Sequence, residues 1–512
     1  MELIPLTPTT NQVLGDLEPH ALGFGRFVDS RTNSIGGRMV YSGERHWIIF
    51  GPNGSGKSMR LLVPNLLQCD FRSFFVIDVK GQMAAITAAH RATIGPVYVI
   101  NPFGCLADDP RYPDLASCGF NPLAKLDPRS PDFNSSVSLL AEALIEIEEK
   151  QPHWGISARS LLAMLIMFTV LEAHDLLPEA VLAITNSKIP PPAVKGVPTM
   201  ARVRQLLCMP SDDVSPAKDG IGIGIPALAL AVQRSGNEGL TNRAGQFTKW
   251  TNEINSVAST ARAQTEAFDD PEIAEDLAKP GPDFGRLKEG PATVFLVLPP
   301  KQLGRHAKWL RLLVASALQA LMVPPERDQP PALLMLEEMA ALGHMEIIES
   351  TFALVRDFKI QMACVYQDLG QIKRLYGARW ESFIANAGIV TSFATGDATT
   401  AEWLSQRSGE VGRPTESTSK SISTNQNPFR IEGNIAANML TARETKSEST
   451  STNISLTKTR LAHPHSLFGM KPGATVNYLA NEANIVLGFA PLWTKVRVCK
   501  TRGRDNPYYI PG

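Results

Sequence analysis

Residues 46–58 read HWIIFGPNGSGKS, an apolar stretch that runs directly into a glycine-rich turn and a lysine–serine pair. The second part, GPNGSGKS, matches the pattern G-x-x-x-x-G-K-[ST] without a gap. The apolar part predicts a buried strand over residues 46–50, and the turn predicts a phosphate-binding loop with a helix that begins at Lys57. A chance glycine-rich turn is the alternative. The lysine–serine pair and the correct flanks on both sides favour the phosphate loop.

Each part of this loop has a chemical role. Consecutive backbone N–H groups at the glycines converge on phosphate oxygens, and the N-terminus of the following helix favours anions. The side chain of Lys57 would reach the terminal phosphates of a nucleotide, and the Ser58 hydroxyl would ligate Mg²⁺. The predicted nucleotide-binding residues are Gly51, Gly54, Ser55, Gly56, Lys57 and Ser58.

Apolar stretches of strand length recur along the rest of the chain. SFFVIDVKG (residues 73–81) and GPVYVINPF (residues 95–103) are separated by a helical stretch over residues 82–92. Strands that alternate with helices indicate a parallel, doubly wound sheet. Further strands are predicted at residues 292–300, 332–338, 360–368, 388–396, 474–480, 484–490 and 494–500. The sequence therefore predicts an α/β fold with a mainly parallel sheet.

A helical period dominates residues 135–279, which predicts an all-α domain inserted into the α/β domain. The α/β domain is then discontinuous, over residues 41–134 and 280–512, and residues 1–40 form a polar segment with a short hairpin at NSIGGRMVYSG. The longest apolar run, SLLAMLIMFTVL, is shorter than the roughly 20 residues that cross a bilayer and predicts a buried helix. Residues 414–460 are rich in Ser and Thr, which predicts a flexible polar loop or an exposed edge hairpin.

The composition is that of a globular, cytosolic protein. The 512 residues carry 50 basic and 50 acidic side chains, so any contact with nucleic acid must come from local basic clusters. The six cysteines are scattered singly, which favours a reducing compartment and argues against a zinc module. His463 and His465 flank Pro464, where a turn is favoured over a metal site. The N-terminus lacks the basic start and apolar core of a signal peptide.

A nucleotide site also needs carboxylates to hold the metal ion and to polarise the attacking water. Two predicted strands end in acids: FFVID ends at Asp78, and LLMLEE ends at Glu337 and Glu338. In RecA-like ATPases the strand after the phosphate-loop helix is not beside the loop, and the metal acid comes from a later strand. The later pair offers two carboxylates at one strand end, where alternation points one at the metal and the next at the water. A helix start at the acids is the alternative, and the turn that follows them favours the strand.

Several stretches, in order along the chain, carry a resemblance to a known family. They are GPNGSGKSMRLLVPNLL, FFVIDVKGQMAAITAAHR, LLMLEEMAALG, LVRDFKIQMACVYQDLGQIKRLYG and KPGATVNYLANEANIVLGFAPLWTKVR. They resemble type IV secretion coupling proteins of the TraG/TraD type, hexameric ATPases that deliver DNA and attached proteins to conjugation machinery. The resemblance covers most of residues 40–500. It implies a RecA-like motor domain that binds ATP and Mg²⁺.

The resemblance also implies roles for individual side chains. Glu337 would take the metal-side acid position, and Glu338 would be the catalytic base. Arg356 would reach the γ-phosphate in the neighbouring subunit, although from the residues alone it reads as a surface arginine beside Asp357. Gln367 would be the sensor that links the state of the γ-phosphate to movement.

The implied assembly is a homo-hexamer that grips single- or double-stranded DNA in a central pore. The expected contacts are loops around QIKRLYGARW (residues 371–380), through Lys373, Arg374 and Arg379 with neighbouring aromatics. A solvated loop is the alternative. The all-α domain would meet relaxase or effector proteins. The expected location is the cytoplasmic face of the inner membrane, next to membrane components of the secretion machine.

Two features depart from the family pattern. Family members usually begin with transmembrane helices, and none is predicted here, which implies a soluble form or a shortened chain. Glu337 stands where the family usually has Asp, and the extra methylene shifts the carboxylate by about one C–C bond. Two alternatives therefore stay open: a nucleotide-binding recruitment module with little hydrolysis, and a DNA pump of the FtsK/HerA type outside conjugation.

Overall fold

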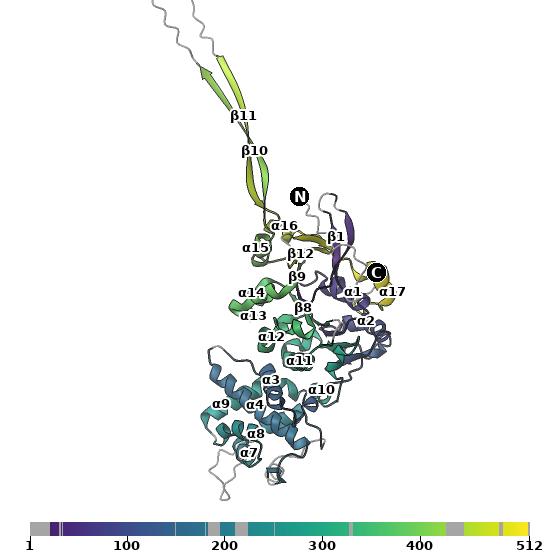
Figure 1. Ribbon diagram of the computed structural model, residues 1–512, viewed down its shortest axis with the longest axis vertical. Helices are drawn as coiled ribbons and strands as arrows, with labels where there is room; N and C mark the ends of the chain where they lie inside the picture. The colour runs from purple at the N-terminus through teal and green to yellow at the C-terminus, as the bar shows by residue number, and fades with distance from the viewer. Residues whose placement is uncertain are drawn as a thin grey trace, which may run out of the picture.

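The centre of the computed structural model is a sheet of eleven strands in the order β2-β1-β13-β12-β9-β3-β8-β7-β4-β6-β5 (Figure 1). The structure describes residues 21–29, 32, 34–148, 150–179, 181–182, 195–209, 224–249, 251–326, 331–425, 445–480 and 485–509. The strands are β1 (Leu22–Val28), β2 (Ile35–Tyr41), β3 (His46–Phe50), β4 (Phe74–Asp78), β5 (Val97–Ile100), β6 (Thr293–Val297), β7 (Ala332–Leu336), β8 (Ile360–Tyr366), β9 (Ala387–Ser392), β12 (Ala474–Leu479) and β13 (Val486–Phe489). From β9 to β5 all neighbours pair in parallel, and from β9 to β2 they pair antiparallel. The prediction of an α/β fold with a mainly parallel sheet is confirmed.

The central strands are near-continuous apolar runs because the sheet is covered on both faces. Every residue of β3, β4, β6, β7, β8 and β9 is buried. Successive side chains of β3 enter two different cores: Ile48 and Phe50 join one, and Trp47 and Ile49 join the other. This burial on both sides is why the strands could be recognised from sequence without an alternating polar pattern.

Helices supply the two covering layers. The core that contains Trp47 also takes in residues of α1 (Val63–Gln68), α2 (Gln82–Ala92) and α17 (Arg497–Arg502). On the opposite face the long helix α11 (Pro300–Leu321) packs with the sheet and with the helices below it. Shorter helices complete the α/β part: α12 (Glu346–Thr351), α13 (Leu369–Tyr376), α14 (Trp380–Asn386), α15 (Ala398–Arg407) and α16 (Pro464–Phe468).

The helix after the phosphate loop begins with a π-helical turn over Ser58–Leu62, in which the Val63 N–H donates to the Ser58 carbonyl. α1 follows directly and carries Pro64 in its first turn. Proline lacks an N–H donor, so it is tolerated at a helix start and disrupts a helix interior. The position of Pro64 in the sequence predicts a short or bent helix after the loop, and the structure has one, with the irregular turn on its N-terminal side.

All described elements between Phe133 and Asp276 are helical, and we call this part the helical region. They are α3 (Phe133–Leu144), α4 (Pro152–Ala173), α6 (Met200–Leu207), α7 (Ile225–Val232), α8 (Glu238–Ala244), α9 (Asn252–Gln264) and α10 (Pro271–Asp276). Among the described residues, α4 alone is long and apolar enough to cross a membrane, and 72% of its apolar window is buried inside the molecule. α4 is the core helix of this region, as its apolar run predicted.

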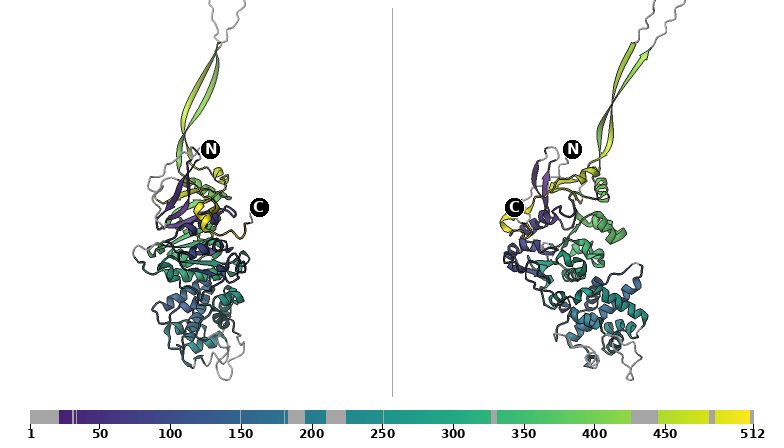
Figure 2. Two further views of the ribbon diagram at one scale, coloured as in Figure 1. Left: turned by 90° about the vertical axis from the view of Figure 1, so that its right-hand side faces the viewer. Right: turned by 180° about the vertical axis from the view of Figure 1, so that it is seen from behind.

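Two hairpins lie at the other end of the molecule (Figure 2). β1 and β2 form an N-terminal hairpin, which extends the main sheet because β1 pairs with β13. The short hairpin predicted within NSIGGRMVYSG is wrong, because this stretch supplies the single strand β2 and its partner β1 precedes it. β10 (Glu410–Asn425) and β11 (Thr445–Arg460) form a separate, two-stranded antiparallel ribbon. The prediction of a flexible loop over residues 414–460 is wrong for the described part, where cross-strand pairing satisfies the polar backbone, and the exposed hairpin is observed instead. Residues 426–444 lie outside the described residues.

The strand predicted at residues 494–500 is also wrong, because this segment forms the helix α17 after a 3₁₀ turn over Trp493–Lys495. The alternation of Val496 and Val498 suggested a strand, but the side chain of Val498 is exposed and Cys499 alone enters the core. A helix places that single buried residue against the sheet-covering layer and leaves Arg497 and Lys500 exposed, while Arg502 donates to the Leu67 carbonyl and Asp70.

Candidate nucleotide site

The phosphate loop, residues 51–58, connects β3 to the first helical turn. Gly54 and Gly56 have φ angles of 81° and 84°, a left-handed conformation that favours glycine and lets the backbone curl. The Lys57 ammonium turns back into the loop and donates to the carbonyls of Gly51, at 2.5 Å, and Pro52, at 3.2 Å. The loop thus brings the lysine and the backbone of the glycine-rich turn together, as the sequence motif predicted.

The acid pair, Glu337 and Glu338, lies directly after the carboxyl end of β7. The prediction that LLMLEE is a strand that ends in acids is confirmed, and the alternative of a helix start is wrong. β8 separates β7 from β3 in the sheet, so Glu337 faces the phosphate loop from two strands away. The Glu337 carboxylate accepts a hydrogen bond from the Ser58 hydroxyl. Burial raises the pKa of Glu337, and hydrogen bonds from Ser58 and the Val79 N–H oppose that rise. The two predicted metal ligands are therefore in direct contact.

Glu338 is directed differently from its neighbour. Burial raises the pKa of Glu338, while the positive charge of Lys57 and a hydrogen bond from the Gln367 side chain oppose the rise. Gln367 follows the end of β8, the strand between the loop and the acids. Lys57, Glu338 and Gln367, predicted from three separate stretches of sequence, thus meet at one edge of the sheet.

Asp78 is the member of this site that sequence reasoning set aside. β4 pairs with β7 in a register that places Ile77 beside Leu336, so Asp78 ends its strand next to Glu337. Its carboxylate accepts the backbone N–H groups of Gln82, at 3.1 Å, and Ala84, at 2.8 Å, which fixes the start of α2. Burial and the charge of Glu337 raise the pKa of Asp78 to about 7. Asp78 could have been identified from the sequence, because two parallel strands that end at the same edge of the sheet both end in an acid.

The residues present fit a nucleoside triphosphate and a divalent cation. The Ser55 hydroxyl is buried in the loop and has no hydrogen-bond partner among the described residues, which leaves a donor available for a phosphate oxygen. Burial lowers the pKa of Lys57, and the charges of Glu338 and Glu337 oppose that fall. Lys57 and the loop N–H groups would hold the phosphates, and Ser58 with Glu337 would hold Mg²⁺.

Binding of Mg²⁺–nucleotide should release protons. In the folded protein the raised pKa of Asp78, about 7, means that it holds a proton at pH values where the unfolded chain has lost it. This stabilises the fold at low pH, and the stabilisation is lost as the pH rises towards 7. A cation beside Glu337 favours the ionised acids, so affinity should weaken as the pH falls below 7, by up to about tenfold per unit for one linked proton. Calorimetry in buffers of different ionisation enthalpy measures the release, and an Asp78→Asn variant that releases as many protons would contradict this account.

Arg356 lies away from this cluster within one chain. It belongs to a 3₁₀ turn over Val355–Phe358, immediately before β8, and so marks the opposite edge of the sheet from Lys57. Its side chain is 47% exposed and lies 3.7 Å from Asp357. The length of β8 places it about 20 Å from the loop. A role at a nucleotide therefore requires a neighbouring subunit and stays a prediction.

The stretch over residues 371–380 is helical, and its prediction as a loop is wrong. Asp368 caps α13 by accepting the Gln371 N–H at 2.9 Å, and Gly377, with a φ of 50°, ends the helix before α14 begins. Helical spacing buries Ile372 and Tyr376 and leaves the basic side chains outside.

The three basic residues of this helical turn are exposed. The Lys373 ammonium lies 4.6 Å from the centre of the Trp380 ring, a cation–π contact, and Arg379 pairs with Glu349 at 3.2 Å. With Arg374 they form a basic face beside an aromatic ring. Such a face suits a nucleic-acid backbone, and contact with DNA stays a prediction.

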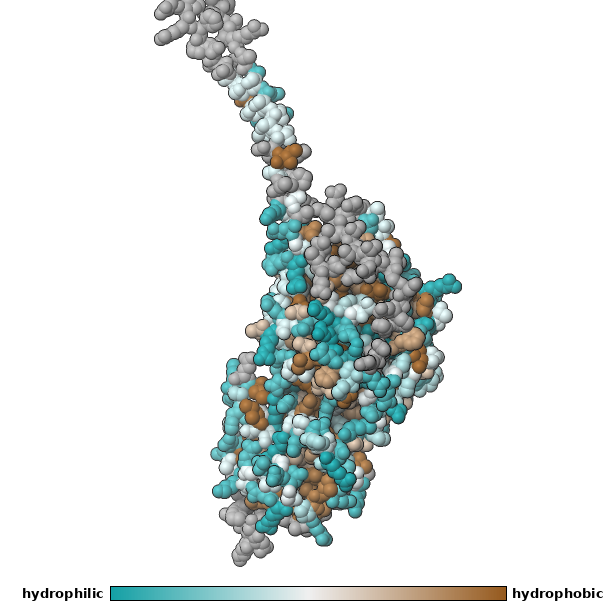
Figure 3. Space-filling model, viewed as in Figure 1, coloured by the Kyte–Doolittle hydropathy of each residue, from teal (hydrophilic) through white to brown (hydrophobic). Residues whose placement is uncertain are grey.

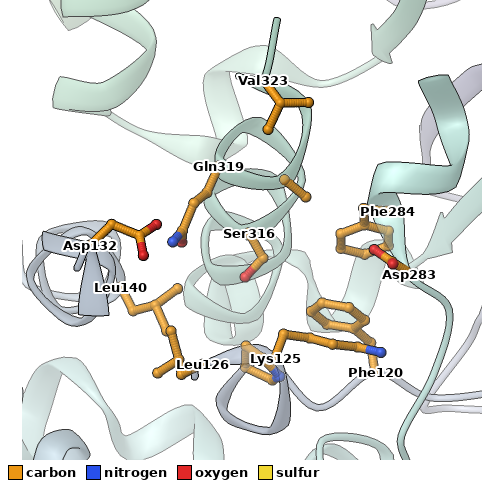
Figure 4. A pocket seen from close by; sticks show the side chains of 12 residues that line it. Phe120, Lys125, Leu126, Asp132, Leu140, Asp283, Phe284, Ser316, Gln319 and Val323 are labelled. Atoms are coloured by element: carbon orange, nitrogen blue, oxygen red, sulfur yellow. The ribbon is translucent and has the colours of Figure 1, made fainter. Parts of the chain in front are cut away.

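A separate cavity of about 300 Å³ lies where the chain passes between the sheet and the helical region (Figure 4). Side chains of both connecting segments, of α3 and of α11 line it: Phe120, Pro122, Lys125, Leu126, Asp132, Leu140, Asp283, Phe284, Ser316, Gln319, Ala320 and Val323. None of the predicted nucleotide residues belongs to it, so it is a feature of the junction.

Other metal-like patterns do not form sites in the described part of the chain. The rings of His463 and His465 stack with centroids 5.5 Å apart at the start of α16, where Pro464 occupies the first turn. The described residues contain no group of three or more His, Cys, Asp or Glu side chains arranged to hold a metal ion. The six cysteines are all free.

Comparison with known proteins agrees with this geometry. The profile of the family described as Type IV secretory system Conjugative DNA transfer matches residues 18–490. The chain is 25% identical to the conjugal transfer protein TraG of Escherichia coli over 72% of this chain and 56% of TraG. It is 23% identical to the protein VirD4 of Rhizobium rhizogenes over 75% of this chain and 52% of VirD4. The chain thus spans a little over half the length of these curated relatives.

Solved structures show the same fold. The bacterial conjugative coupling protein TrwB, in a form named TrwBdeltaN70, superposes with a TM-score of 0.58 at 15% identity, over 88% of this chain and 85% of that one. A structure of TrwB in complex with ADP and Mg²⁺ gives a TM-score of 0.56 at 14% identity, over 88% and 85% of the two chains. At these identities the likeness establishes a phosphate-loop NTPase fold with additional helices.

Proposed function

The chain belongs to the type IV secretory system conjugative DNA transfer family, and from this premise we propose that it is an ATP-driven coupling protein that brings DNA to a type IV secretion machine. The observation that carries the proposal is the convergence of Lys57, Glu337, Glu338 and Gln367 at one edge of the sheet. The resemblance predicted from the motifs is confirmed at the level of the family. The activity to measure is ATP hydrolysis that DNA stimulates.

The side chains at this edge have separate roles in ATP hydrolysis. Lys57 and the loop N–H groups orient the phosphates of ATP, and Ser58 with Glu337 holds the cation. When bound, Mg²⁺ supplies positive charge against the phosphate oxygens. Glu338, which has a raised pKa and a hydrogen bond from Gln367, is placed to accept a proton from the attacking water. The structure of TrwB in complex with ADP and Mg²⁺ supports the proposal that a nucleotide and Mg²⁺ bind to this chain.

A continuous set of contacts leads from the acid to the basic face of α13. The Gln367 side chain binds Glu338, and the Gln367 N–H donates to the side chain of Gln371, at 2.9 Å. Gln371 lies on α13, the helix that carries Lys373 and Arg374. A change in the charge around Glu338 is thereby coupled to the helix proposed to hold DNA, which supports Gln367 as the sensor.

The remaining features of the proposal concern the assembly. The family resemblance implies a homo-hexamer with DNA in a central pore, and the position of Arg356 supports an assembly in which it reaches a phosphate of a neighbouring copy. The helical region, at the end of the molecule away from the ribbon, receives relaxase or effector proteins (Figure 1). Membrane components of the secretion machine hold the ring at the cytoplasmic face of the inner membrane.

Replacement of Arg356 by alanine should lower the ATP turnover of assembled protein by about 10³-fold, as expected for an arginine that neutralises transition-state charge in trans. Wild-type turnover per subunit should rise steeply with protein concentration, because each site is completed by its neighbour. Turnover measured across a concentration series checks both. Arg305→Ala, which removes an exposed arginine of α11, is the matched control. Unchanged turnover in Arg356→Ala would remove the assignment.

A recruitment module with little hydrolysis is the second candidate, favoured by Glu337 in place of the usual Asp. Because the native Glu337 already contacts Ser58, Glu337→Asp should withdraw the carboxylate by about one bond length and slow turnover about ten- to hundredfold. ATP turnover at saturating Mg²⁺ measures the effect. Faster turnover in the variant would show that the native residue restrains hydrolysis, and would favour the recruitment module.

A DNA pump of the FtsK/HerA type outside conjugation is the third candidate. It shares the motor chemistry and differs in its protein partners. Capture of a relaxase by the helical region would favour the coupling protein over the pump.

A further inference from the structure

The ribbon formed by β10 and β11 has two long edges with no third strand among the described residues. Its strands pair without a register shift from Glu410 opposite Arg460 to Asn425 opposite Thr445. In Figure 1 the ribbon stands away from the rest of the molecule. An isolated two-stranded ribbon is only marginally stable in water, and exposed edges are templates for pairing with another chain. Pairing of these edges with a strand of another chain would therefore stabilise the ribbon.

Both faces of the ribbon are hydrophilic, so a membrane or an apolar partner surface does not fit them. On one face three cross-strand serine pairs join their hydroxyls: Ser419 with Ser451, Ser421 with Ser449, and Ser423 with Ser447. The other face carries mostly threonine and charged side chains, with Ile422 and Ile454 as separate exposed apolar residues. Figure 3 shows the ribbon in pale and teal colours with isolated brown residues.

On the basis of the ring-forming coupling protein proposed above, we propose that ribbons of neighbouring copies pair edge to edge, β11 of one copy with β10 of the next, and close into a polar β-tube. In a ring all ribbons point the same way, so β11 of one copy runs antiparallel to β10 of its neighbour. The last copy pairs with the first, and no edge is left open. The tube extends from the end of the molecule opposite the helical region (Figure 2).

Charge complementarity identifies the second copy as the partner. Within one ribbon Lys420 lies opposite Thr450, and Glu448 lies opposite Ile422, so these charges have no opposite charge directly across. A shift by one side-chain repeat, two residues, keeps every side chain on its face. Between copies this shift places Lys420 opposite Glu448. Cross-strand pairs of opposite charge stabilise a sheet.

Pro414 limits where the edges can pair. It lies in β10 near the base of the ribbon and has no N–H to donate. We therefore place the contact between copies beyond it, over residues 418–422 of β10 and 446–450 of β11. Lys420 and Glu448 lie inside these segments.

Disulfide trapping between two variants that each carry one cysteine in the ribbon tests the pairing. In a background with the exposed Cys208 replaced by serine, Lys420→Cys is mixed with Glu448→Cys in the presence of ATP analogue and DNA, and oxidised. A disulfide-linked dimer should appear in the mixture and be absent from either variant alone. Lys420→Cys mixed with Ser447→Cys is the matched control, because Ser447 lies on the other face.

The outcomes separate this proposal from the proposed function. Absence of a dimer when Lys420→Cys is mixed with a cysteine at Glu448, Thr450 or Thr452 would overturn the pairing, and so would a dimer of Lys420→Cys alone. If ATP hydrolysis that depends on Lys57 persists in that case, the coupling function stands without the tube. A dimer in the mixture without DNA-stimulated hydrolysis would support the pairing and remove the motor.

Discussion

Replacement of Glu338 by glutamine should abolish steady-state ATP hydrolysis while nucleotide binding persists. The substitution keeps the shape and the contact with Gln367 and removes the carboxylate that accepts the proton of the attacking water. Loss of a positioned general base lowers rates by about 10²–10⁴-fold. ATP turnover, with a fluorescent nucleotide titration on the same sample, measures the two properties separately.

The control for this variant is Glu381→Gln, an exposed glutamate of α14 outside the site. It should hydrolyse ATP at the wild-type rate. If Glu338→Gln also kept that rate, Glu338 would not be the base. Glu337, the other carboxylate at this strand end, would then be the remaining candidate for the base.

Replacement of Lys57 by alanine should remove nucleotide binding and hydrolysis together. The lysine is the cation closest to the loop carbonyls of Gly51 and Pro52, and it also offsets the negative charge of Glu338. Without it two acids with raised pKa values face the phosphates alone, and charge repulsion opposes binding. The loss of one preorganised donor lowers turnover by about 10²–10³-fold, and the loss of a full charge lowers it further.

Lys249→Ala, at an exposed position of the helical region, is the control for this variant. Thermal unfolding with and without Mg²⁺–nucleotide provides a readout other than activity. The wild-type protein and the control should be stabilised by nucleotide, and Lys57→Ala should not. Equal stabilisation of Lys57→Ala would show that the loop binds nucleotide without its lysine.

The buried strands could be predicted from sequence because the sheet is covered on both faces. Strands β3, β7 and β8 are near-continuous apolar runs, and the glycine-rich turn and the acid pair mark where two of them end. Parallel strands then bring their carboxyl ends to one edge. Lys57, Glu337 and Glu338 could be placed together for that reason, and the family resemblance added Gln367.

What sequence reasoning missed depended on tertiary contacts. Asp78 was set aside because it stands alone in sequence, and its pairing with Glu337 follows from the register of β4 on β7. The helix α17 was predicted as a strand because an alternating valine pattern does not reveal that one residue alone is buried. The stretch over residues 371–380 was predicted as a loop although Asp368 caps α13 locally, because the burial of Ile372 and Tyr376 on one helix face was not recognised. In each case the local sequence was compatible with two structures, and packing in the folded protein favoured one of them.

The most direct test of the account is ATP hydrolysis by the purified protein as a function of DNA and of protein concentration. We expect turnover that DNA stimulates, that rises with assembly, and that exceeds the rate of Lys57→Ala under the same conditions. A wild-type rate no higher than that of Lys57→Ala, at every DNA and protein concentration and with added relaxase, would contradict the claim that this chain is a motor.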